Sequence, residues 1–401
     1  MAILTPPEKI TNILNRLTEE GHAAYLVGGC VRDSIIGLHV NDWDIATSAA
    51  PKEVARIFPK TTLTGEKFGT VTVLLDEEAV EVTTFRAENE YHDGRHPENV
   101  EYISNIEEDL GRRDFTINAM AVSITGELVD PYGGLKDIEH RIIRSVGGPN
   151  TRFSEDALRM FRAYRFSAQL GFAIEYDTKL AIYANTEKAR QISAERVRVE
   201  LEKTIMTQRP ELAGEIVKIG LLSRYLLSPG KTPYGVESIA KLPMEPALRW
   251  SAFCAGLIAN ELITSASEFL HDIRLDGKTI KACTRALAIP EFPADSVGIK
   301  RLLAIHGVDA VRCAAAANDT LKTARGEPAS ALTDAGEVIA GGECYSYDKL
   351  AVTGSDLIAR GHPPGRELGE TLYRLLEHVF EHPETNTRET LLELAQHMIE
   401  A

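Results

Sequence analysis

Short apolar runs that end at glycine mark the first structured region of the chain. Residues 25–27 (Tyr-Leu-Val) are apolar and run into Gly28 and Gly29, a pattern typical of a buried strand that leaves into a tight turn. We expect a short helix after this turn, and then a second strand that carries Asp42 and Asp44. This succession of strand, turn and helix predicts an α/β fold.

The α/β pattern continues along the chain. Residues 51–58 predict a helix that begins at a proline, a residue that fits the first helical position. Two β-rich runs follow, at 69–75 and 80–85, and the acidic turn between them predicts a hairpin. Residues 86–100 are polar and lack helical periodicity, which predicts a mobile loop, whereas 107–122 has the pattern of a helix with Arg-Arg-Asp at its centre.

From about residue 140 the hydrophobic pattern is almost wholly helical. The clearest predicted helices span 154–170, with Ser154 as N-cap, and 193–206. Proline and glycine interrupt the helical pattern further on, for example at 228–235 and 289–296. We therefore place the first domain boundary just before this helical part begins.

The composition is that of a soluble globular protein with more than one core. The chain has 401 residues, of which 44% are hydrophobic and 26% charged, and about two to four domains are expected at this length. It lacks an apolar run of the ~20 residues that a membrane-spanning helix needs, and its first twenty residues do not resemble a signal peptide. Five scattered cysteines form no Cys-x-x-Cys pair, which predicts a cytoplasmic protein without disulfides.

The charge is unevenly distributed. The formal net charge of the whole chain is −15, yet residues 141–209 contain 13 Lys and Arg against 8 Asp and Glu. A basic segment in an acidic protein produces a local field that can hold a polyanion such as a nucleic acid. Helices with solvated charged faces would give the same count, so the charge alone leaves both interpretations open.

Asp42 and Asp44 are the first candidates for chemistry. Residues two apart in a strand point to the same side, so these carboxylates would meet at one place. Paired oxygen ligands beside a glycine turn, whose N–H groups can face a phosphate, favour Mg²⁺ over zinc. Glu81 would add a third carboxylate if its strand is a neighbour. A turn with two solvated acids and an unpaired surface glutamate are the alternatives.

Six segments occur in the order and at the spacings of one enzyme family. They are LVGGCVRD with NDWDIAT (26–47), EVTTFR (81–86), RRDFTINAMA (112–121), DPYGGLKDI (130–138), EDALRMFRAYRF (155–166) and ISAERVRVEL (192–201). On these segments the chain resembles the bacterial class II tRNA nucleotidyltransferases, the CCA-adding enzymes and their poly(A) polymerase relatives. The resemblance covers roughly the first half of the chain, and residues 352–369 also resemble the C-terminal part of members from Gram-positive-type bacteria.

The resemblance implies a polymerase-β-like α/β head followed by all-α domains that hold the acceptor arm of tRNA. The implied reaction is attack of the RNA 3′-hydroxyl on the α-phosphate of CTP or ATP, which releases pyrophosphate and uses two Mg²⁺ ions but no nucleic-acid template. The implied domains are a catalytic head over 1–139, a neck over 140–207, a body over 208–272 and a tail over 273–401.

The same resemblance implies roles for individual residues. Asp42 and Asp44 would bind the metal ions, with Glu81 as the supporting acid. Asp114 would accept a hydrogen bond from the ribose 2′-hydroxyl and so select ribonucleotides. The other implied nucleotide-binding residues are Gly28, Gly29 and Arg32 on the triphosphate, with Asp33 orienting Arg32, and Arg113, Asn118, Asp156, Arg159 and Arg162.

Asp156 and Arg159 are three residues apart on a predicted helix and so would share one face. Cytosine and adenine both present an amino donor next to a ring-nitrogen acceptor, whereas guanine and uracil present the reverse. A carboxylate facing the amine and a guanidinium facing the ring nitrogen would accept C and A and leave polar groups unsatisfied against G and U. An exposed helical ion pair worth under about 1 kcal/mol is the alternative.

The resemblance leaves the exact specificity to decide. Members that add only CC have a shortened loop after the EVTTFR strand, and here that flexible loop, with Arg86, Asp93, Gly94 and Arg95, has full length. Poly(A) polymerases of this group tend to carry a basic C-terminal extension, and this tail is acidic. Full CCA addition is therefore favoured, and an enzyme that adds only A beside a separate CC-adding enzyme is the nearest alternative.

Two alternatives belong to other classes of protein. A catalytically silent tRNA-binding protein would be expected to have lost Asp42, Asp44 or Asp156, and all three are present. A nucleotidyltransferase for small molecules would not need the long helical half. His271-Asp272 lacks the further ligands of a metal-dependent phosphohydrolase and is expected to lie on a helix surface. The oligomeric state is left open.

Overall fold

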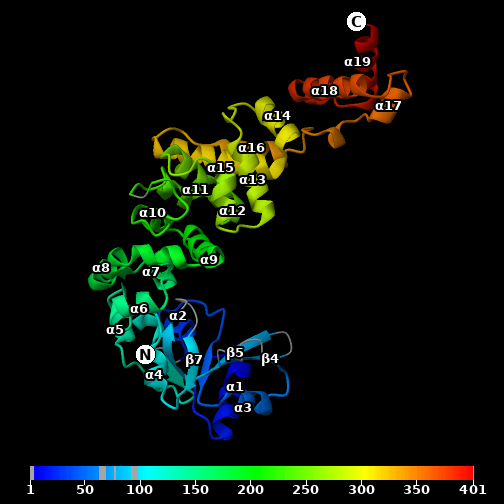
Figure 1. Cartoon of the computed structure of the whole chain (residues 1–401). Helices are drawn as coiled ribbons and strands as arrows, with labels where there is room; N and C mark the ends of the chain where they lie inside the picture. The colour runs from blue at the N-terminus through cyan, green and yellow to red at the C-terminus, as the bar shows by residue number, and fades with distance from the viewer. Residues whose placement is uncertain (1–3, 63–68, 76–77, 92–96, 229, 401) are drawn as a thin grey trace. The chain divides into compact units, whose positions relative to one another are not determined.

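The apolar strands predicted in the first third of the chain pair into one sheet (Figure 1). Contacts divide the chain into two units, Met1–Glu200 and Leu201–Ala401, and the boundaries of the four predicted domains stay a prediction. Within the described ranges, every helix is too short or too polar to cross a membrane. The computed structural model describes residues 4–62, 69–75, 78–91, 97–228 and 230–400.

The centre of the sheet is β1 (Ala24–Val27), the strand predicted before the glycine turn. It pairs antiparallel with β2 (Ile45–Thr47) and with β8 (Ala121–Ser123). β2 in turn pairs parallel with β5 (Glu78–Thr84). The sheet has seven strands in the order β3-β4-β5-β2-β1-β8-β9, in which β3 is Thr61–Thr62, β4 is Thr70–Leu75 and β9 is Leu128–Val129.

Two predicted helices of the first unit, α2 and α3, are confirmed, and one further helix, α1, precedes them. α1 (Glu8–Glu19) buries Ile10, Ile13, Leu14 and Leu17, the spacing of one apolar helix face. α3 (Pro51–Ile57) begins at its proline and contacts β4, β5 and α1, so α1 and α3 lie side by side (Figure 1). α2 (Gly29–Ile35) follows the glycine turn directly. The predicted hairpin of β4 and β5 is also present, with antiparallel pairing.

The prediction of a mobile loop over 86–100 missed two strands in the described part of this segment. β6 (Arg86–Tyr91) and β7 (Pro97–Tyr102) pair antiparallel as a separate two-stranded sheet. This polar stretch lacks the apolar alternation that usually marks strands. The hydrophobic pattern therefore did not predict the two strands. The Asp-Gly dipeptide at 93–94 was the available hairpin signal, although residues 92–96 lie outside the described residues.

The helix predicted over 107–122 is also wrong in extent. α4 (Ile106–Gly111) ends early, a 3₁₀ turn, η2 (Thr116–Asn118), follows, and β8 takes up the remaining apolar residues. Asp114 explains the break, because its Oδ1 accepts a 2.8 Å hydrogen bond from the backbone N–H of Phe115. Such local bonds compete with the helical pattern. Arg112, Arg113 and Asp114 therefore lie in a connection after α4, not at the centre of a helix.

The helix predicted over 154–170 is two helices, α6 (Pro149–Glu155) and α7 (Leu158–Leu170). Asp156 separates them with an extended backbone, and its Oδ1 accepts from the N–H of Leu158, the first residue of α7, at 3.0 Å. The N-cap of α7 is Ala157, so the prediction of Ser154 as N-cap is wrong. Ser154 lies in the last turn of α6 and donates to the Asn150 carbonyl. Further elements are α5 (Gly134–Glu139), β10 (Ile142–Ile143), β11 (Ala173–Ile174), α8 (Tyr176–Ala184), η3 (Thr186–Gln191) and α9 (Ala194–Ile205).

The second unit is helical, as the hydrophobic pattern predicts. α11 (Pro246–Ala259), α13 (Gly277–Leu287) and α15 (Val308–Ala324) pack on one another, and His271 and Asp272 end α12 (Ala266–Asp272) on its exposed side. The other elements are α10 (Glu211–Lys218), η4 (Val236–Lys241), α14 (Ser296–His306), α16 (Ala331–Ala340), η5 (Tyr347–Lys349), α17 (Gly354–Ile358), α18 (Arg366–Glu381), η6 (Pro383–Thr385) and α19 (Arg388–Glu400).

Gly134 gives a test of how tightly the head is packed. A Cβ at this first residue of α5 would overlap the carbonyl oxygen of Thr116 in η2 and lie 2.9 Å from Met120 Cγ. We expect Gly134→Ala to lower the free energy of unfolding by about 1–3 kcal/mol, because the clash involves backbone. Thermal unfolding would measure the change.

Gly336 provides the matched control. It lies within α16 and a Cβ there would meet nothing within 4 Å. Gly336→Ala should raise stability by up to about 1 kcal/mol through helix propensity. An equal response of the two variants would contradict the packing assigned to Gly134.

Candidate active site

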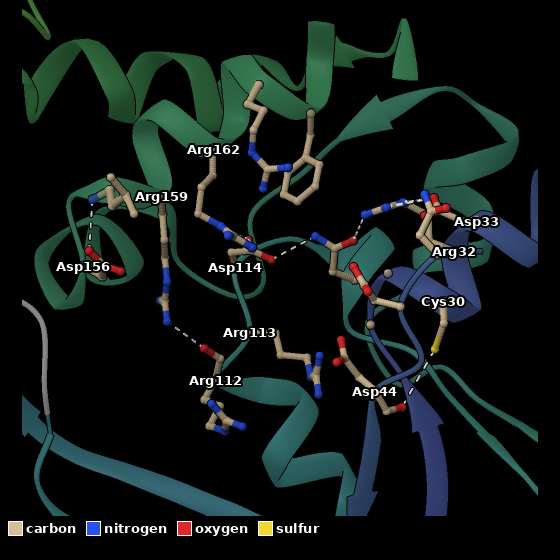
Figure 2. Close-up of a pocket in the computed structure, with 18 of the residues that line it drawn as sticks. Cys30, Arg32, Asp33, Asp44, Arg112, Arg113, Asp114, Asp156, Arg159 and Arg162 are labelled. Atoms are coloured by element: carbon tan, nitrogen blue, oxygen red, sulfur yellow. Dashed lines mark hydrogen bonds and ion pairs between the residues drawn. The ribbon is translucent and has the colours of Figure 1, made fainter. Parts of the chain in front are cut away.

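A cavity of about 630 Å³ lies in the first unit, within the size range of small-ligand sites (Figure 2). Eight arginines and five aspartates are among its lining residues, so the wall is charged and carries more positive than negative side chains. The lining residues are Gly28, Gly29, Cys30, Arg32, Asp33, Asn41, Asp42, Asp44, Arg86, Arg112, Arg113, Asp114, Asn118, Asp156, Leu158, Arg159, Arg162, Arg165, Phe166 and Arg196.

The glycine turn lies at the cavity wall, where the sequence predicted it. Gly28 has φ +75°, a conformation that glycine adopts without strain. A Cβ on Gly28 would lie 2.8 Å from Nη1 of Arg113 and 3.8 Å from Oδ2 of Asp44. Glycine therefore allows an arginine and a carboxylate to approach the backbone at this point.

Asp42 and Asp44 both line the cavity, as expected for carboxylates that point to one side. They do not lie within the strand, however, because β2 begins at Ile45. The backbone still continues the pairing, since Val27 N–H donates to the Asp44 carbonyl at 3.1 Å. Asp44 thus lies one residue before the strand and Asp42 three residues before it.

Glu81 lies on β5, where the next residue, Val82, is the register partner of Ile45. The predicted neighbouring strand is therefore present. Glu81 is exposed and is not among the lining residues of the cavity, but its charge acts on Asp44. Burial raises the pKa of the Asp44 carboxyl, Arg113 opposes this, and the charges of Glu81 and Asp42 raise it further.

The carboxylates of Asp42 and Asp44 fit a divalent cation that takes only part of its ligands from the protein. In the described part of the chain, no group of three or more His, Cys, Asp or Glu could hold a metal ion by itself. Asp42 and Asp44 nevertheless supply two hard oxygen donors at one wall, and their mutual repulsion is of the kind that a cation relieves. Mg²⁺ commonly uses one or two carboxylates and completes its shell with substrate phosphates and water.

Asp114 accepts hydrogen bonds at both of its carboxylate oxygens. Its Oδ2 accepts from Nε and Nη2 of Arg162, both at 2.7 Å, and its Oδ1 accepts from Asn118 Nδ2 at 3.1 Å. Burial alone would raise the pKa of the Asp114 carboxyl, but Arg162 and Asn118 outweigh burial and hold this pKa well below its usual range. Asp114 is therefore a buried, permanently charged acceptor.

The network continues from Asn118 to the glycine turn. Asn118 Oδ1 accepts from Nη1 of Arg32 in α2, and Arg32 Nε donates to Asp33 Oδ1 at 2.8 Å. The predicted orienting role of Asp33 thus has a geometric counterpart. Arg32 is 8% exposed and is aimed at the cavity from the helix that follows the glycines (Figure 2).

Asp156 and Arg159 line the same cavity but are not paired with each other through their side chains. Asp156 Oδ2 accepts from Arg196 Nη2 at 2.7 Å, whereas Arg159 Nη1 donates to Glu155 Oε2 at 2.7 Å. Arg159 Nη2 also donates to the Arg112 carbonyl at 2.8 Å. The expectation that both lie on one helix is wrong, because Asp156 precedes α7 and Arg159 lies in its first turn.

The predicted flexible-loop residues are only partly within the described chain. Arg86 lines the cavity at the start of β6, and its backbone N–H donates to Asp109 Oδ1 at 3.2 Å. Asp109 also accepts from Arg112 Nε at 3.0 Å. Asp93, Gly94 and Arg95 lie outside the described residues.

Sequence reasoning missed several residues of the site. Arg165 and Phe166 in α7 line the cavity, and the guanidinium carbons of Arg32, Arg162 and Arg165 lie 5.1, 5.2 and 4.0 Å from the centre of the Phe166 ring. The spacing of Arg162 and Arg165, one helical turn, was an available signal. Arg112 and Arg196 were missed as well.

Three family models match successive parts of the chain. The model described as poly A polymerase head domain matches residues 24–144. A model described as a probable RNA- and SrmB-binding site of polymerase A matches 171–227, and one described as tRNA nucleotidyltransferase domain 2, putative, matches 245–395.

Relatives match nearly the whole length. A CCA-adding enzyme from Limosilactobacillus fermentum is 38% identical over 402 residues, which cover 97% of this chain and 96% of the relative. One from Geobacillus kaustophilus is 38% identical and covers 92% of each chain. The crystal structure of the Bacillus stearothermophilus CCA-adding enzyme in complex with CTP has a TM-score of 0.79 at 33% identity, covering 99% of this chain and 98% of that one.

The depressed pKa of Asp114 predicts how stability depends on pH. An acid with a lowered folded-state pKa stabilises the fold above its unfolded pKa of about 3.9, and this stabilisation is lost as the pH falls through the folded pKa. At pH 7 we expect Asp114→Asn to cost roughly 2 kcal/mol, a moderate value because the Arg162 side chain is 33% exposed. The difference in thermal midpoint between the unmodified protein and Asp114→Asn should become smaller below about pH 4.

The control for this test is Asp272→Asn, because Asp272 is exposed at the end of α12. Its thermal midpoint should follow that of the unmodified protein at each pH. A deficit of Asp114→Asn that stays constant down to pH 3 would contradict the charged state assigned to Asp114.

Proposed function

Because the chain belongs to the family of CCA-adding enzymes, we propose that it adds C and A nucleotides to the 3′ end of tRNA without a nucleic-acid template. It is a nucleotidyltransferase, and tRNA, CTP and ATP are its substrates. The polymerase-β-like head and the helical remainder that the sequence predicted agree with the fold of its relatives. Since these substrates are cytoplasmic molecules, we place the enzyme in the cytoplasm.

One observation carries the assignment of the active site. A single cavity is lined by the carboxylate pair Asp42 and Asp44 and by the buried acceptor Asp114. The carboxylate of Asp156 and the guanidinium of Arg159 line the same cavity. These are the groups that a ribonucleoside triphosphate requires at its phosphates, its sugar and its base. Segments far apart in the sequence supply them, so their meeting supports a common ligand.

The arginines of the cavity are suited to the triphosphate. Arg32 follows the glycine turn and is already oriented by Asp33 and Asn118. In the transfer, the RNA 3′-oxygen forms a bond to the α-phosphorus, the bond from that phosphorus to the pyrophosphate breaks, and the hydroxyl proton leaves to water. Charge that moves onto the pyrophosphate is stabilised by fixed positive groups, which need no reorganisation.

Asp42 and Asp44 would hold the Mg²⁺ ions, with Glu81 acting through its charge on Asp44. When bound, magnesium lowers the pKa of the attacking hydroxyl and neutralises charge on the leaving pyrophosphate. The chain's own contribution is to keep these two acids at one wall beside the arginines, with Arg113 close to Asp44 (Figure 2).

Base selection is assigned to Asp156 and Arg159. Each is held by other protein groups, Asp156 by Arg196 and Leu158 N–H, Arg159 by Glu155 and the Arg112 carbonyl. A carboxylate and a guanidinium held apart in this way are positioned to meet the amino group and the ring nitrogen shared by cytosine and adenine. Because their side chains bond to Arg196 and Glu155 and not to each other, the contacts argue against the alternative of an ion pair between them.

The first test is transfer itself. With Mg²⁺ and labelled CTP or ATP, tRNA that lacks its 3′ end should receive both C and A. Asp44→Ala should lower this transfer by about 10³-fold or more, because it removes a metal donor from the reacting groups. Denaturing gels of single-turnover reactions would measure it.

Asp272→Ala, at an exposed position outside the cavity, is the matched control and should transfer at the normal rate. If the unmodified chain adds only A, and only to tRNA that ends in CC, the A-adding alternative is correct. Long A tails on RNA in general would identify a poly(A) polymerase. Full transfer by Asp44→Ala would exclude its assigned role.

The second test addresses base selection. Asp156→Ala should lower the preference for CTP over UTP, expressed as the ratio of kcat/KM values, by about 100-fold, because hydrogen-bonded recognition is then lost. Arg159→Ala should do the same. A ratio that remains unchanged while the rate falls would show that these residues act on stability and not on the base.

A further inference from the structure

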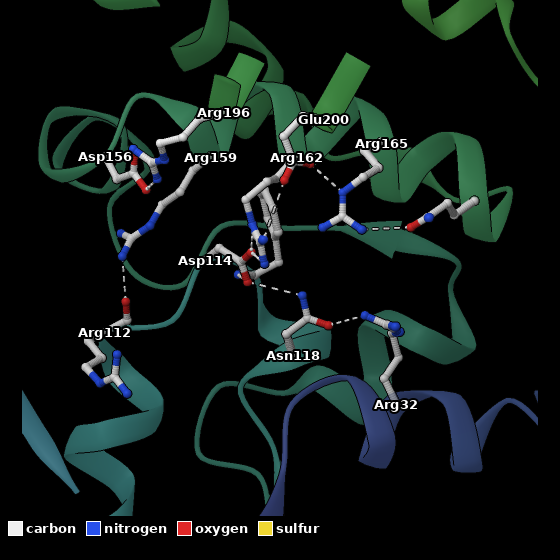
Figure 3. A network of polar contacts seen from close by, with 12 residues as sticks. Arg32, Arg112, Asp114, Asn118, Asp156, Arg159, Arg162, Arg165, Arg196 and Glu200 are labelled. Carbon is white, nitrogen blue, oxygen red and sulfur yellow. Dashed lines mark hydrogen bonds and ion pairs between the residues drawn. The ribbon is translucent and has the colours of Figure 1, made fainter. Parts of the chain in front are cut away.

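Helix α9 presents two charged side chains to the site, neither of which has a role in the proposed reaction. Arg196 and Glu200 are four residues apart, so they lie on one face of the helix. Figure 3 shows this face above the network, with Arg196 beside Asp156 and Glu200 beside Arg162 and Arg165. Arg196 lines the cavity, whereas Glu200 lies behind it and is 5% exposed.

Arg196 holds the carboxylate that faces the base. Its Nη2 lies 2.7 Å from Asp156 Oδ2, while Asp156 Oδ1 accepts from the N–H of Leu158 at 3.0 Å. One oxygen is thus fixed by the backbone and the other by the helix α9. Without Arg196, the second oxygen would lose the partner that sets the plane of the carboxylate.

Glu200 holds the arginines next to the carboxylate that faces the sugar. Glu200 Oε2 accepts from Arg165 Nε, and Glu200 Oε1 lies 3.8 Å from Arg162 Nη1. The guanidiniums of Arg162 and Arg165 both lie over the Phe166 ring, so two positive charges are close together in a partly buried environment. Glu200 offsets their repulsion and leaves Arg162 free to direct Nε and Nη2 to Asp114.

The position of Arg162 matters because Arg162 occupies acceptor sites of Asp114. Its two oxygens already accept four hydrogen bonds, from Arg162 Nε and Nη2, from Asn118 and from the N–H of Phe115. A carboxylate offers about four acceptor sites. A ribose hydroxyl can bond to Asp114 only by sharing or displacing one of these donors, and Arg162 supplies both donors on Oδ2. Glu200 is the acid next to Arg162 on the side away from Asp114.

We propose that α9 carries two positioning residues that set two separate selectivities, Arg196 for the base through Asp156 and Glu200 for the sugar through Arg162 and Asp114. This inference rests on the nucleotidyltransferase function proposed above. Both residues lie on one face of α9, one helical turn apart. One of them would support the selection of C and A over U and G, and the other the selection of ribonucleotides over deoxynucleotides.

The test measures two ratios of kcat/KM for each variant of the full chain, CTP over UTP and ATP over dATP, with tRNA primers that end before or after CC. Arg196→Gln should lower the CTP-over-UTP ratio by about tenfold and change the ATP-over-dATP ratio by less than about twofold. Glu200→Gln should produce the opposite pattern. Arg196→Lys, which keeps the charge but not the planar donor pair, should recover part of the base ratio.

Lys203→Gln is the matched control, because Lys203 is an exposed charged residue of the same helix, and it should leave both ratios unchanged. If both ratios fall together in both variants, or if neither ratio changes, the proposal is wrong and α9 has only a structural role. Where Arg196→Gln or Glu200→Gln does not fold, Arg196→Lys and Glu200→Asp are measured by the same two ratios. Failure of the unmodified chain to transfer C or A would contradict the proposed function instead.

Discussion

The ion pair between Asp114 and Arg162 is the interaction on which the rest of the site depends. A charged carboxylate that is only 8% exposed is costly unless its partners replace water, and here two N–H groups of Arg162, one amide of Asn118 and one backbone N–H do so. Asp114 follows the end of α4 and Arg162 lies in α7, so the pair joins the region of the sheet to the helices behind it. Breaking it would leave a buried charge on each side.

Positive charge dominates the cavity although the whole chain has a net charge of −15. The aspartates of the wall act mainly on neighbouring arginines, as Asp33 does on Arg32, and so hold their side chains in place before any ligand arrives. A triphosphate would then meet guanidiniums that need little reordering. Local concentration of one sign of charge also explains how an acidic protein attracts a polyanion.

Much of the head could be predicted because its signals are local. The apolar run at β1, the glycine turn, the proline of α3 and the hairpin of β4 and β5 each depend on a few consecutive residues. The errors at Asp114 and Asp156 share one cause: each aspartate accepts a hydrogen bond from a nearby backbone N–H and breaks a helix that the apolar spacing would continue.

The support of the site could not be predicted from local pattern. Arg196 and Glu200 act on residues 40 and 35 positions away in the chain, and their own helix has the ordinary charged face of a surface helix. Asp42, Asp44, Asp156 and Arg159, which the resemblance to a family singled out, line one cavity. Which side chains hold which others is a matter of tertiary packing, and only the structure contains it.

The central claim is that one preorganised set of buried charges recognises the base and sugar of the nucleotide. Calorimetric titration of the full chain with CTP, ATP, UTP, GTP and dCTP, without tRNA, tests it most directly. CTP and ATP should bind with similar affinity, and the other three nucleotides at least about tenfold more weakly. Equal affinity for all five nucleotides would show that the pocket recognises only the triphosphate and neither the base nor the sugar.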